Sequence, residues 1–261
     1  MTVLSPSDYA DTGQWRLLIK ISPGQMTASL ENTLHDDVAP FQLFEEKWDP
    51  TDDNLLKNIE KTVYDNPRVL DDFSAKIIIF DRKSLFIPEA AVKDEGEIEN
   101  IYCSIYPAEE NDIFTDSFNN IIVAFASGAG VRPFLMRTFP GARITCNLMD
   151  KIRNISDGKG RENKTKEFNG PILHIERREG ESDYILTDSG KLISASTHVT
   201  GTDTDTIYHA LNILDVYDFD PSDVTVDWKG IRRGKETDIL MSKFKEEMTA
   251  AAGKSENSPE F

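Results

Sequence analysis

The chemistry that this sequence could perform centres on a basic cluster near its C-terminal end. Four cations and two glycines follow a predicted strand at Val224–Trp228: Lys229, Gly230, Arg232, Arg233, Gly234 and Lys235. Open α/β sheets usually place ligands at the carboxyl ends of their strands. The position makes Gly230, Arg232 and Arg233 candidates for binding an anion or a nucleotide, although a solvated surface loop is the favoured interpretation.

A second candidate anion site is the turn Ser127–Gly130, which lies between a predicted buried strand at Ile121–Ala126 and a predicted helix. Free backbone amides at a helix N-terminus can hold an anion. The turn does not match the dinucleotide-binding motif, because Pro133 takes the place of its third glycine and no acidic residue lies where a ribose would bind. A tight turn is the favoured interpretation.

The sequence predicts no catalytic residue and no metal site. Its histidines are scattered, without the spacing of metal ligands: His35, His174, His198 and His209. The two cysteines, Cys103 and Cys146, form neither a Cys-x-x-Cys pair nor a disulfide framework. The predicted first strand carries no carboxylate, which argues against a two-metal nuclease. No Gly-x-Ser-x-Gly elbow of a serine hydrolase occurs.

The composition limits the classes of partner. The chain has 261 residues, 39% of them hydrophobic, and a net charge of −17. Such a surface repels phosphate backbones, so we expect neither nucleic-acid binding nor binding to anionic membranes. The apolar runs are too short to cross a bilayer, and the N-terminal residues do not look like a secretion signal. These features predict a cytoplasmic protein without membrane insertion.

The elements that would position these groups follow one order twice: three antiparallel strands, a helix and a returning strand. In the first copy they are predicted over 15–22, 26–30, 41–46, a helix beginning at 49–51, and 75–81. In the second copy they are predicted over 171–177, 183–187, 191–196, a helix at 202–217, and 224–228. The Thr202-x-x-Asp205 spacing resembles a capping box at the start of the second helix.

This repeat predicts an α/β protein of two duplicated lobes, each of mixed sheet plus helices. We expect the first lobe over 1–155, with a loose lead-in over 1–13, and the second over 168–248. Residues 156–167 read as a mobile interlobe loop and 249–261 as a disordered tail. Between the copies, Pro88 is expected to open a short helix and Lys93–Glu97 to form a polar loop.

The repeated unit resembles the core of the actin-like ATPase fold, in the ribonuclease-H-like class. The chain is also similar, over roughly 12–245, to an uncharacterised bacterial domain-of-unknown-function family (type 3822) with that fold. The stretches that carry the resemblance are Phe139-Pro140 with Ala142 and Ile144, Lys191–Ile193, Thr202–Leu214 with Tyr208, and Gly230. The resemblance implies a fold and not an activity.

An active actin-like ATPase would need two phosphate loops that resemble Asp-x-Gly, one at the first hairpin of each lobe. Here the first hairpin has Lys20 or Ser22 where the Asp would stand, and the second has two arginines in its turn. Asp188-Ser-Gly190 spells the motif, but at a later hairpin, where a tight turn is the better interpretation. Glu176 is interpreted as a solvated residue on an edge strand.

Two functional hypotheses follow. The first is a non-catalytic scaffold or adaptor that needs no cofactor and binds an unknown protein partner, with a homodimer left open. The alternative is a divergent nucleotide-binding protein or ATPase that uses ATP and Mg²⁺ in the interlobe cleft, near Gly230, Arg232 and Arg233. A weaker third idea is a regulatory partner of a nucleic-acid enzyme that acts through its acidic surface.

Overall fold

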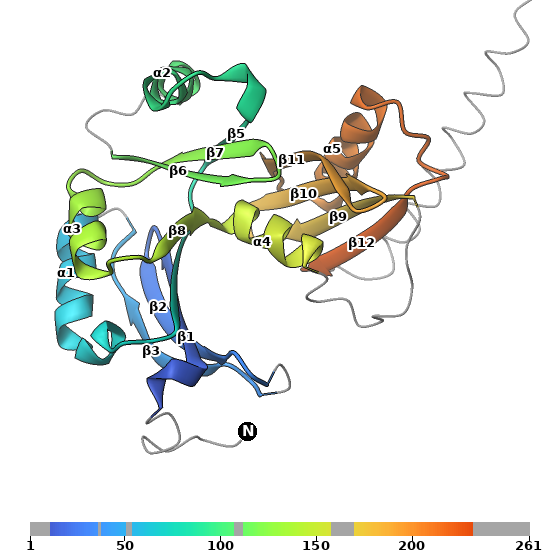
Figure 1. Cartoon of the computed structure of the whole chain (residues 1–261). Helices are drawn as coiled ribbons and strands as arrows, with labels where there is room; N and C mark the ends of the chain where they lie inside the picture. The colour runs from blue at the N-terminus through green and yellow to red at the C-terminus, as the bar shows by residue number, and fades with distance from the viewer. Residues whose placement is uncertain (1–10, 36–37, 51–53, 107–111, 158–169, 232–261) are drawn as a thin grey trace, which may run out of the picture. The chain divides into compact units, whose positions relative to one another are not determined.

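The computed structural model describes residues 11–35, 38–50, 54–106, 112–157 and 170–231 (Figure 1). The chain forms two compact units, Met1–Lys151 and Ile152–Phe261, which are described separately below. The boundary between them falls within helix α4 (Asn147–Ser156). The lead-in over 1–10, residues 232–248 of the predicted second lobe, the tail over 249–261 and most of the loop over 156–167 lie outside the described residues.

The first unit is built on a five-stranded sheet in the order β3-β2-β1-β4-β8. Its strands are β1 (Trp15–Ser22), β2 (Gln25–Asn32), β3 (Phe41–Lys47), β4 (Ala75–Phe80) and β8 (Arg143–Cys146). β1 pairs antiparallel with β2 and parallel with β4. Alternate residues of β1, such as Leu17 and Ile19, are fully buried, as the period-two pattern of a strand with one inner face requires.

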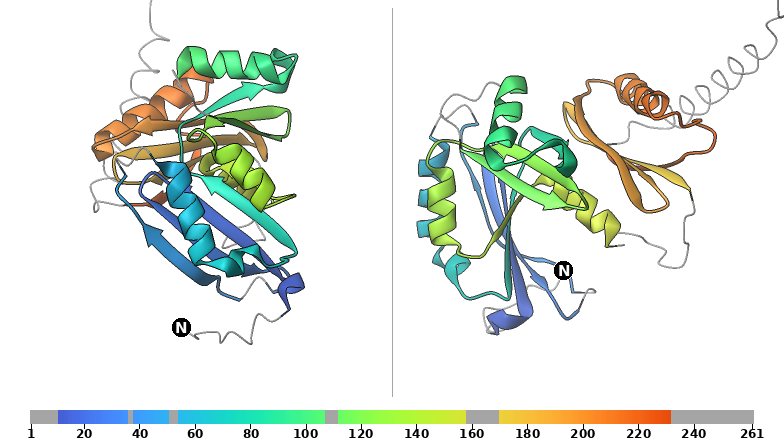
Figure 2. Two further views of the ribbon diagram at one scale, coloured as in Figure 1. Left: turned by 90° about the vertical axis from the view of Figure 1, so that its left-hand side faces the viewer. Right: turned by 45° about the horizontal axis from the view of Figure 1, so that its top comes forward.

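Helices α1 (Leu55–Asp65) and α3 (Val131–Thr138) lie side by side in this unit (Figure 2). α1 buries Leu55, Ile59 and Val63, which recur at helical spacing, and a 3-10 turn, η2 (Pro67–Leu70), follows it. The predicted helix start at 49–51 is not where α1 begins, because Asn54 is its N-cap. A further 3-10 turn, η1 (Thr12–Gln14), precedes β1.

A smaller three-stranded sheet, in the order β5-β7-β6, is inserted between β4 and β8. It consists of β5 (Ser84–Pro88), β6 (Ile113–Phe118) and β7 (Ile121–Ala126), with 3-10 turn η3 (Glu89–Ala91) and helix α2 (Glu95–Ile105) after β5. α2 packs Ile98 and Tyr102 onto the sheet. The polar loop expected over Lys93–Glu97 is therefore wrong for Glu95–Glu97, because Asp94 caps α2 by accepting from the Glu97 N–H.

In its described residues, the second unit has a four-stranded sheet in the order β11-β10-β9-β12, against which helix α5 (Asp203–Val216) packs. Its strands are β9 (Pro171–Arg177), β10 (Glu181–Asp188), β11 (Lys191–Val199) and β12 (Thr225–Gly230). α5 lies over this sheet (Figure 2). It buries Ala210 and Leu214 against Leu173, Tyr184 and Leu186 of the sheet. The predicted capping box is confirmed, since Thr202 and Asp205 exchange their side-chain and backbone hydrogen bonds.

The two units repeat one topology. The strand orders β3-β2-β1-β4 and β11-β10-β9-β12 correspond to each other. In each copy, the strand that comes first in the sequence pairs parallel with the one that comes last: β1 with β4, and β9 with β12. This confirms the predicted duplicated α/β architecture. It also places the two first hairpins, β1–β2 and β9–β10, in equivalent positions of the two units.

Candidate phosphate-binding positions

The first hairpin turns at Pro23–Gly24, between β1 and β2, and is covered by a neighbouring segment of its own chain. The Trp48 indole N–H donates to the Pro23 carbonyl at 2.8 Å, and the Trp48 backbone N–H donates to the Gly24 carbonyl at 2.9 Å. A Cβ at Gly24 would lie 3.3 Å from the Pro50 Cβ. Residues 48–50 therefore close over the turn instead of entering α1, which explains why the helix starts later than its sequence suggests.

The second hairpin turns at Arg178–Gly180, between β9 and β10, and its arginine is engaged by a buried carboxylate. Arg178 Nη2 donates to both oxygens of Asp183, at 3.0 and 3.2 Å, and Arg178 Nη1 lies 2.8 Å from Glu181. Asp183 is only 1% exposed and accepts a further hydrogen bond from the Thr197 hydroxyl at 2.6 Å. The cation that could attract a phosphate here is paired within the hairpin.

The preceding residue, Arg177 at the end of β9, is buried and forms an ion pair with Asp203, the first residue of α5. The two side chains are 5% and 11% exposed. Asp203 also lies where a carboxylate is favoured by the helix dipole. The ion pair between Asp203 and Arg177 thus joins the N-terminal end of α5 to the second hairpin.

Hydroxyl groups complete this buried polar region. The Ser182 hydroxyl lies 2.7 Å from that of Thr200 and 3.4 Å from that of Thr206. The Tyr184 hydroxyl donates to the Thr206 carbonyl at 2.9 Å, and burial raises the pKa of Tyr184 to about 12. These groups satisfy one another, so the region resembles a polar core more than a vacant binding site.

The glycine-containing turn at Ser127–Gly130 is also satisfied internally. Gly130 has φ +76° and is the N-cap of α3, and the Arg132 backbone N–H donates to an Asp112 carboxylate oxygen at 2.9 Å. The Ser127 N–H donates to the Asp112 carbonyl at 2.9 Å. A carboxylate of the chain therefore occupies the position at which an external anion would meet the helix N-terminus, and the predicted tight turn is confirmed.

Of the predicted anion-binding residues, Gly230 is described and Arg232 and Arg233 lie outside the described residues. Gly230 is the last residue of β12, with φ +85°, and it pairs with Arg177 of β9. A Cβ at this position would lie 2.1 Å from the Arg177 carbonyl oxygen, which accepts from the Ile231 N–H at 3.1 Å. Close backbone approach thus requires glycine here, while the anion-binding role stays a prediction.

Sequence reasoning missed a histidine–carboxylate pair. His174 Nδ1 lies 3.0 Å from Asp227 Oδ2, and the two residues are direct neighbours on the parallel strands β9 and β12. Only the strand register could have revealed the pair, because 53 residues separate its members in sequence. The interpretation of Glu176 as an edge residue is wrong, since β9 lies between β10 and β12 and Glu176 is half-buried.

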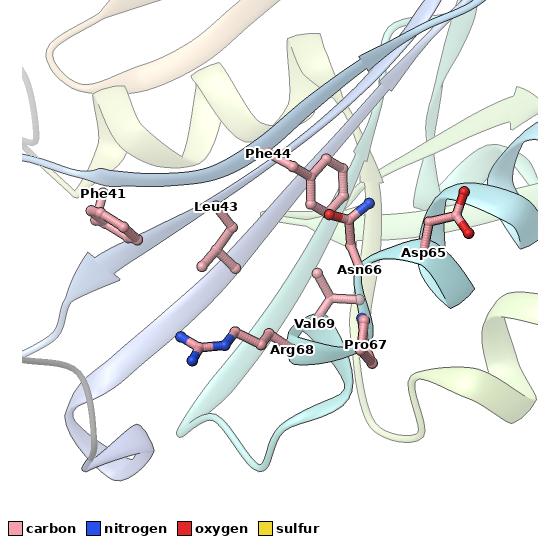
Figure 3. Close-up of a pocket in the computed structure, with 8 residues that line it drawn as sticks. All are labelled: Phe41, Leu43, Phe44, Asp65, Asn66, Pro67, Arg68 and Val69. Atoms are coloured by element: carbon pink, nitrogen blue, oxygen red, sulfur yellow. The ribbon is translucent and has the colours of Figure 1, made fainter. Parts of the chain in front are cut away.

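A groove of about 410 Å³ lies beside β3, away from the hairpin turns (Figure 3). Its lining combines residues of β3 with residues around η2: Phe41, Leu43, Phe44, Asp65, Asn66, Pro67, Arg68 and Val69. The aromatic and aliphatic side chains make it an apolar groove and not a phosphate cradle. Within the described ranges, no group of three or more His, Cys, Asp or Glu residues could hold a metal ion.

None of the helices in the described part of the chain has the length and apolar character needed to cross a bilayer.

Comparison with solved structures places this geometry in a known fold. A Bacteroides thetaiotaomicron protein with an actin-like ATPase fold and unknown function is 20% identical, with a TM-score of 0.71 over 92% of this chain and 90% of its own. An Aquifex aeolicus Ppx/GppA phosphatase is 10% identical, with a TM-score of 0.39 over 88% of this chain and 61% of its own. A ROK family glucokinase from Streptomyces griseus, solved with glucose and AMPPNP, is 10% identical, with a TM-score of 0.38 over 72% of this chain and 48% of its own.

No curated protein matches the chain. At the level of families, residues 5–245 match the family described as protein of unknown function (DUF3822). This match spans both units, and the first of the structural likenesses covers nearly the whole of both chains. The chain therefore belongs to the DUF3822 family of proteins of unknown function and has the actin-like ATPase fold.

Proposed function

We propose that this protein is a non-catalytic, cytoplasmic scaffold or adaptor built on the actin-like ATPase fold. The observation that carries the proposal is the state of the two first hairpins. Neither has an Asp-x-Gly sequence, and in each the turn or its cation is engaged by other groups of the same chain.

The second hairpin supplies the stronger support. A phosphate that bound Arg177 or Arg178 would have to displace the carboxylates of Asp203 or Asp183, which are held in buried ion pairs. Removing one partner from a buried pair typically costs about 3–5 kcal/mol. Phosphate binding at this hairpin would therefore carry the free-energy cost of breaking a buried ion pair.

The first hairpin lacks the carboxylate that a Mg²⁺ site would need. Mg²⁺ is usually held in such sites through a carboxylate and the substrate phosphates. β1 and its turn contain no carboxylate, and Lys20 is exposed on the strand. A cation at this place would repel a metal ion instead of holding it.

The test is ATP hydrolysis by the purified chain, measured with and without Mg²⁺. We expect no turnover above the protein-free rate, and no difference between the wild type and the Lys20→Ala or Arg178→Ala variants. Mg²⁺-dependent turnover that is lost in either variant would overturn the proposal in favour of a divergent ATPase. Circular dichroism of both variants controls for loss of folding.

A further inference from the structure

Strand β11 is an edge of the second unit's sheet, and its regular part, Ser194–Val199, lacks the features that usually protect such edges from pairing. Natural edge strands are kept apart by charges, proline or short length. Among the described edge strands, β3 carries Glu45 and Glu46, β12 carries Asp227, β6 carries Asp116, β5 ends in Pro88, and β8 is only four residues long. β11 spans nine residues without Asp, Glu or Pro.

The backbone of β11 presents its hydrogen-bonding groups to the open side. The Thr200 N–H donates to the Gly180 carbonyl at 3.0 Å, on the β10 side. In an antiparallel ladder successive residues point their N–H and C=O groups to alternate sides. The groups of Ala195, Thr197 and Val199 are therefore directed away from β10, toward an added strand.

The side chains of β11 suit a second copy of the same strand. The ladder with β10 is regular from Ser194 to Val199. In an antiparallel pairing centred on Ser196, Ala195 of one copy stands opposite Thr197 of the other, and this match occurs twice by symmetry. Both residues are small, which allows the strands to approach closely, and Val199, an exposed large hydrophobic at 80%, follows them.

Charge favours the same partner. Because a copy of the chain carries a net charge of −17, two copies repel each other wherever carboxylates meet. β11 offers no carboxylate, and its one permanent charge is the cation Lys191. Among the described edge strands, β11 is the longest that an acidic copy can approach without meeting Asp or Glu.

Helix α5 adds surface to this edge (Figure 1). The ring of His209 on α5 stacks on His198 of β11, with centroids 4.3 Å apart, and the neighbouring Tyr208 is 63% exposed. A two-fold axis between paired strands stands perpendicular to the sheet, so it places both α5 helices on the same face. Tyr208 from each copy would then extend the contact beyond the strands.

We propose that β11 is a homodimerisation edge, through which two copies pair antiparallel about a two-fold axis at Ser196 and form one continuous sheet. The occupant of the edge is a second copy of this chain. This inference stands independently of whether the protein binds nucleotide.

Sedimentation velocity over a concentration series tests the proposal with the full chain. We expect a monomer–dimer equilibrium in the wild type. Val199→Glu should raise the dissociation constant by about a hundredfold, since it brings two carboxylates into the contact. The matched control is Gln42→Glu, which adds the same charge to the exposed edge strand β3 and should leave the equilibrium unchanged.

A wild type that stays monomeric throughout the series would overturn the proposal, as would equal effects of the two charges. Val199 is 80% exposed, so Val199→Glu should fold, which an unchanged melting temperature would verify.

Cross-linking supplies a second readout that depends on the register. In a Cys103→Ser background, which removes the exposed native thiol, Ser196→Cys should form a disulfide-linked dimer when oxidised with glutathione disulfide. Opposed residues of an antiparallel pair lie within disulfide reach. Gln42→Cys on β3 is the control and should remain monomeric. No linked dimer from Ser196→Cys, or equal amounts from both variants, would contradict the pairing.

Discussion

At the scale of single residues, the two stacked imidazoles of the second unit make stability depend on pH. Burial, and then the nearby His209, lower the pKa of His198 below its ordinary value of 6.5. The groups facing His198 are the rings of Tyr184 and His209 and the Ser196 hydroxyl, none of which offers a negative charge. The stack is therefore built for neutral imidazoles.

The sign of the effect follows from linkage. A folded-state pKa below the unfolded value means that the contribution to stability is present above about pH 6.5 and is lost as the pH falls through the folded pKa. We expect the melting temperature to fall between about pH 7.5 and 5, and His209→Gln to make the fall shallower. Melting curves across this range check it, and a slope unchanged by the substitution would contradict it.

At the scale of elements, the ion pair between Arg177 and Asp203 fastens the end of β9 to the start of α5. Asp203→Ala leaves a buried guanidinium without its anion, so we expect a loss of about 3–5 kcal/mol in unfolding free energy. The double variant Arg177→Met with Asp203→Leu should recover part of this loss, because no buried charge remains. Urea denaturation followed by circular dichroism measures both.

An exposed ion pair provides the control for this substitution. Glu45 and Lys47 lie 2.9 Å apart with side chains 39% and 70% exposed, so Glu45→Gln should change stability by less than about 1 kcal/mol. Equal effects of Asp203→Ala and Glu45→Gln would show that the buried pair does not hold the hairpin to the helix.

The pairing of β12 with β9 depends on the absence of a side chain at Gly230. Gly230→Ala would combine a positive φ with a Cβ placed 2.1 Å from the Arg177 carbonyl oxygen, and we expect a loss of about 3 kcal/mol or more. Gly190→Ala is the matched control, since its φ is +78° and nothing lies within 4 Å of the added Cβ. It should cost about 1 kcal/mol from backbone strain alone. Similar losses in the two variants would refute the close-approach argument.

The sequence was informative where its pattern is local. The strands predicted over 15–22 and 171–177 coincide with β1 and β9, and the Thr202-x-x-Asp205 spacing located the start of α5. It was uninformative where tertiary contacts decide. The delayed start of α1 depends on Trp48 binding the first hairpin, and the β5–α2 insertion has no second copy among the described elements with which to compare it.

At the candidate site, too, local features could be predicted from the sequence and tertiary contacts could not. The absence of Asp-x-Gly could be read from the sequence, but the partners of the two hairpin arginines could not, because Asp183 and Asp203 meet them only through hairpin pairing and helix packing. The same holds for His174 and Asp227, which two parallel strands bring together.

At the scale of the whole molecule, the repeated topology is that of an actin-like ATPase, while the positions equivalent to its phosphate loops are engaged by the chain itself. The proposed scaffold or adaptor role rests on this arrangement. The central claim is therefore that these hairpins do not bind a nucleotide.

A thermal-shift series with ATP, ADP and GTP in the presence of Mg²⁺ tests this claim most directly. A ligand that binds only the native state stabilises it by about 2.7 kcal/mol at a hundred times its dissociation constant. The account predicts no rise in melting temperature at millimolar concentrations of any of the three nucleotides. A rise that grows with nucleotide concentration, and is reduced by Arg178→Ala, would contradict it.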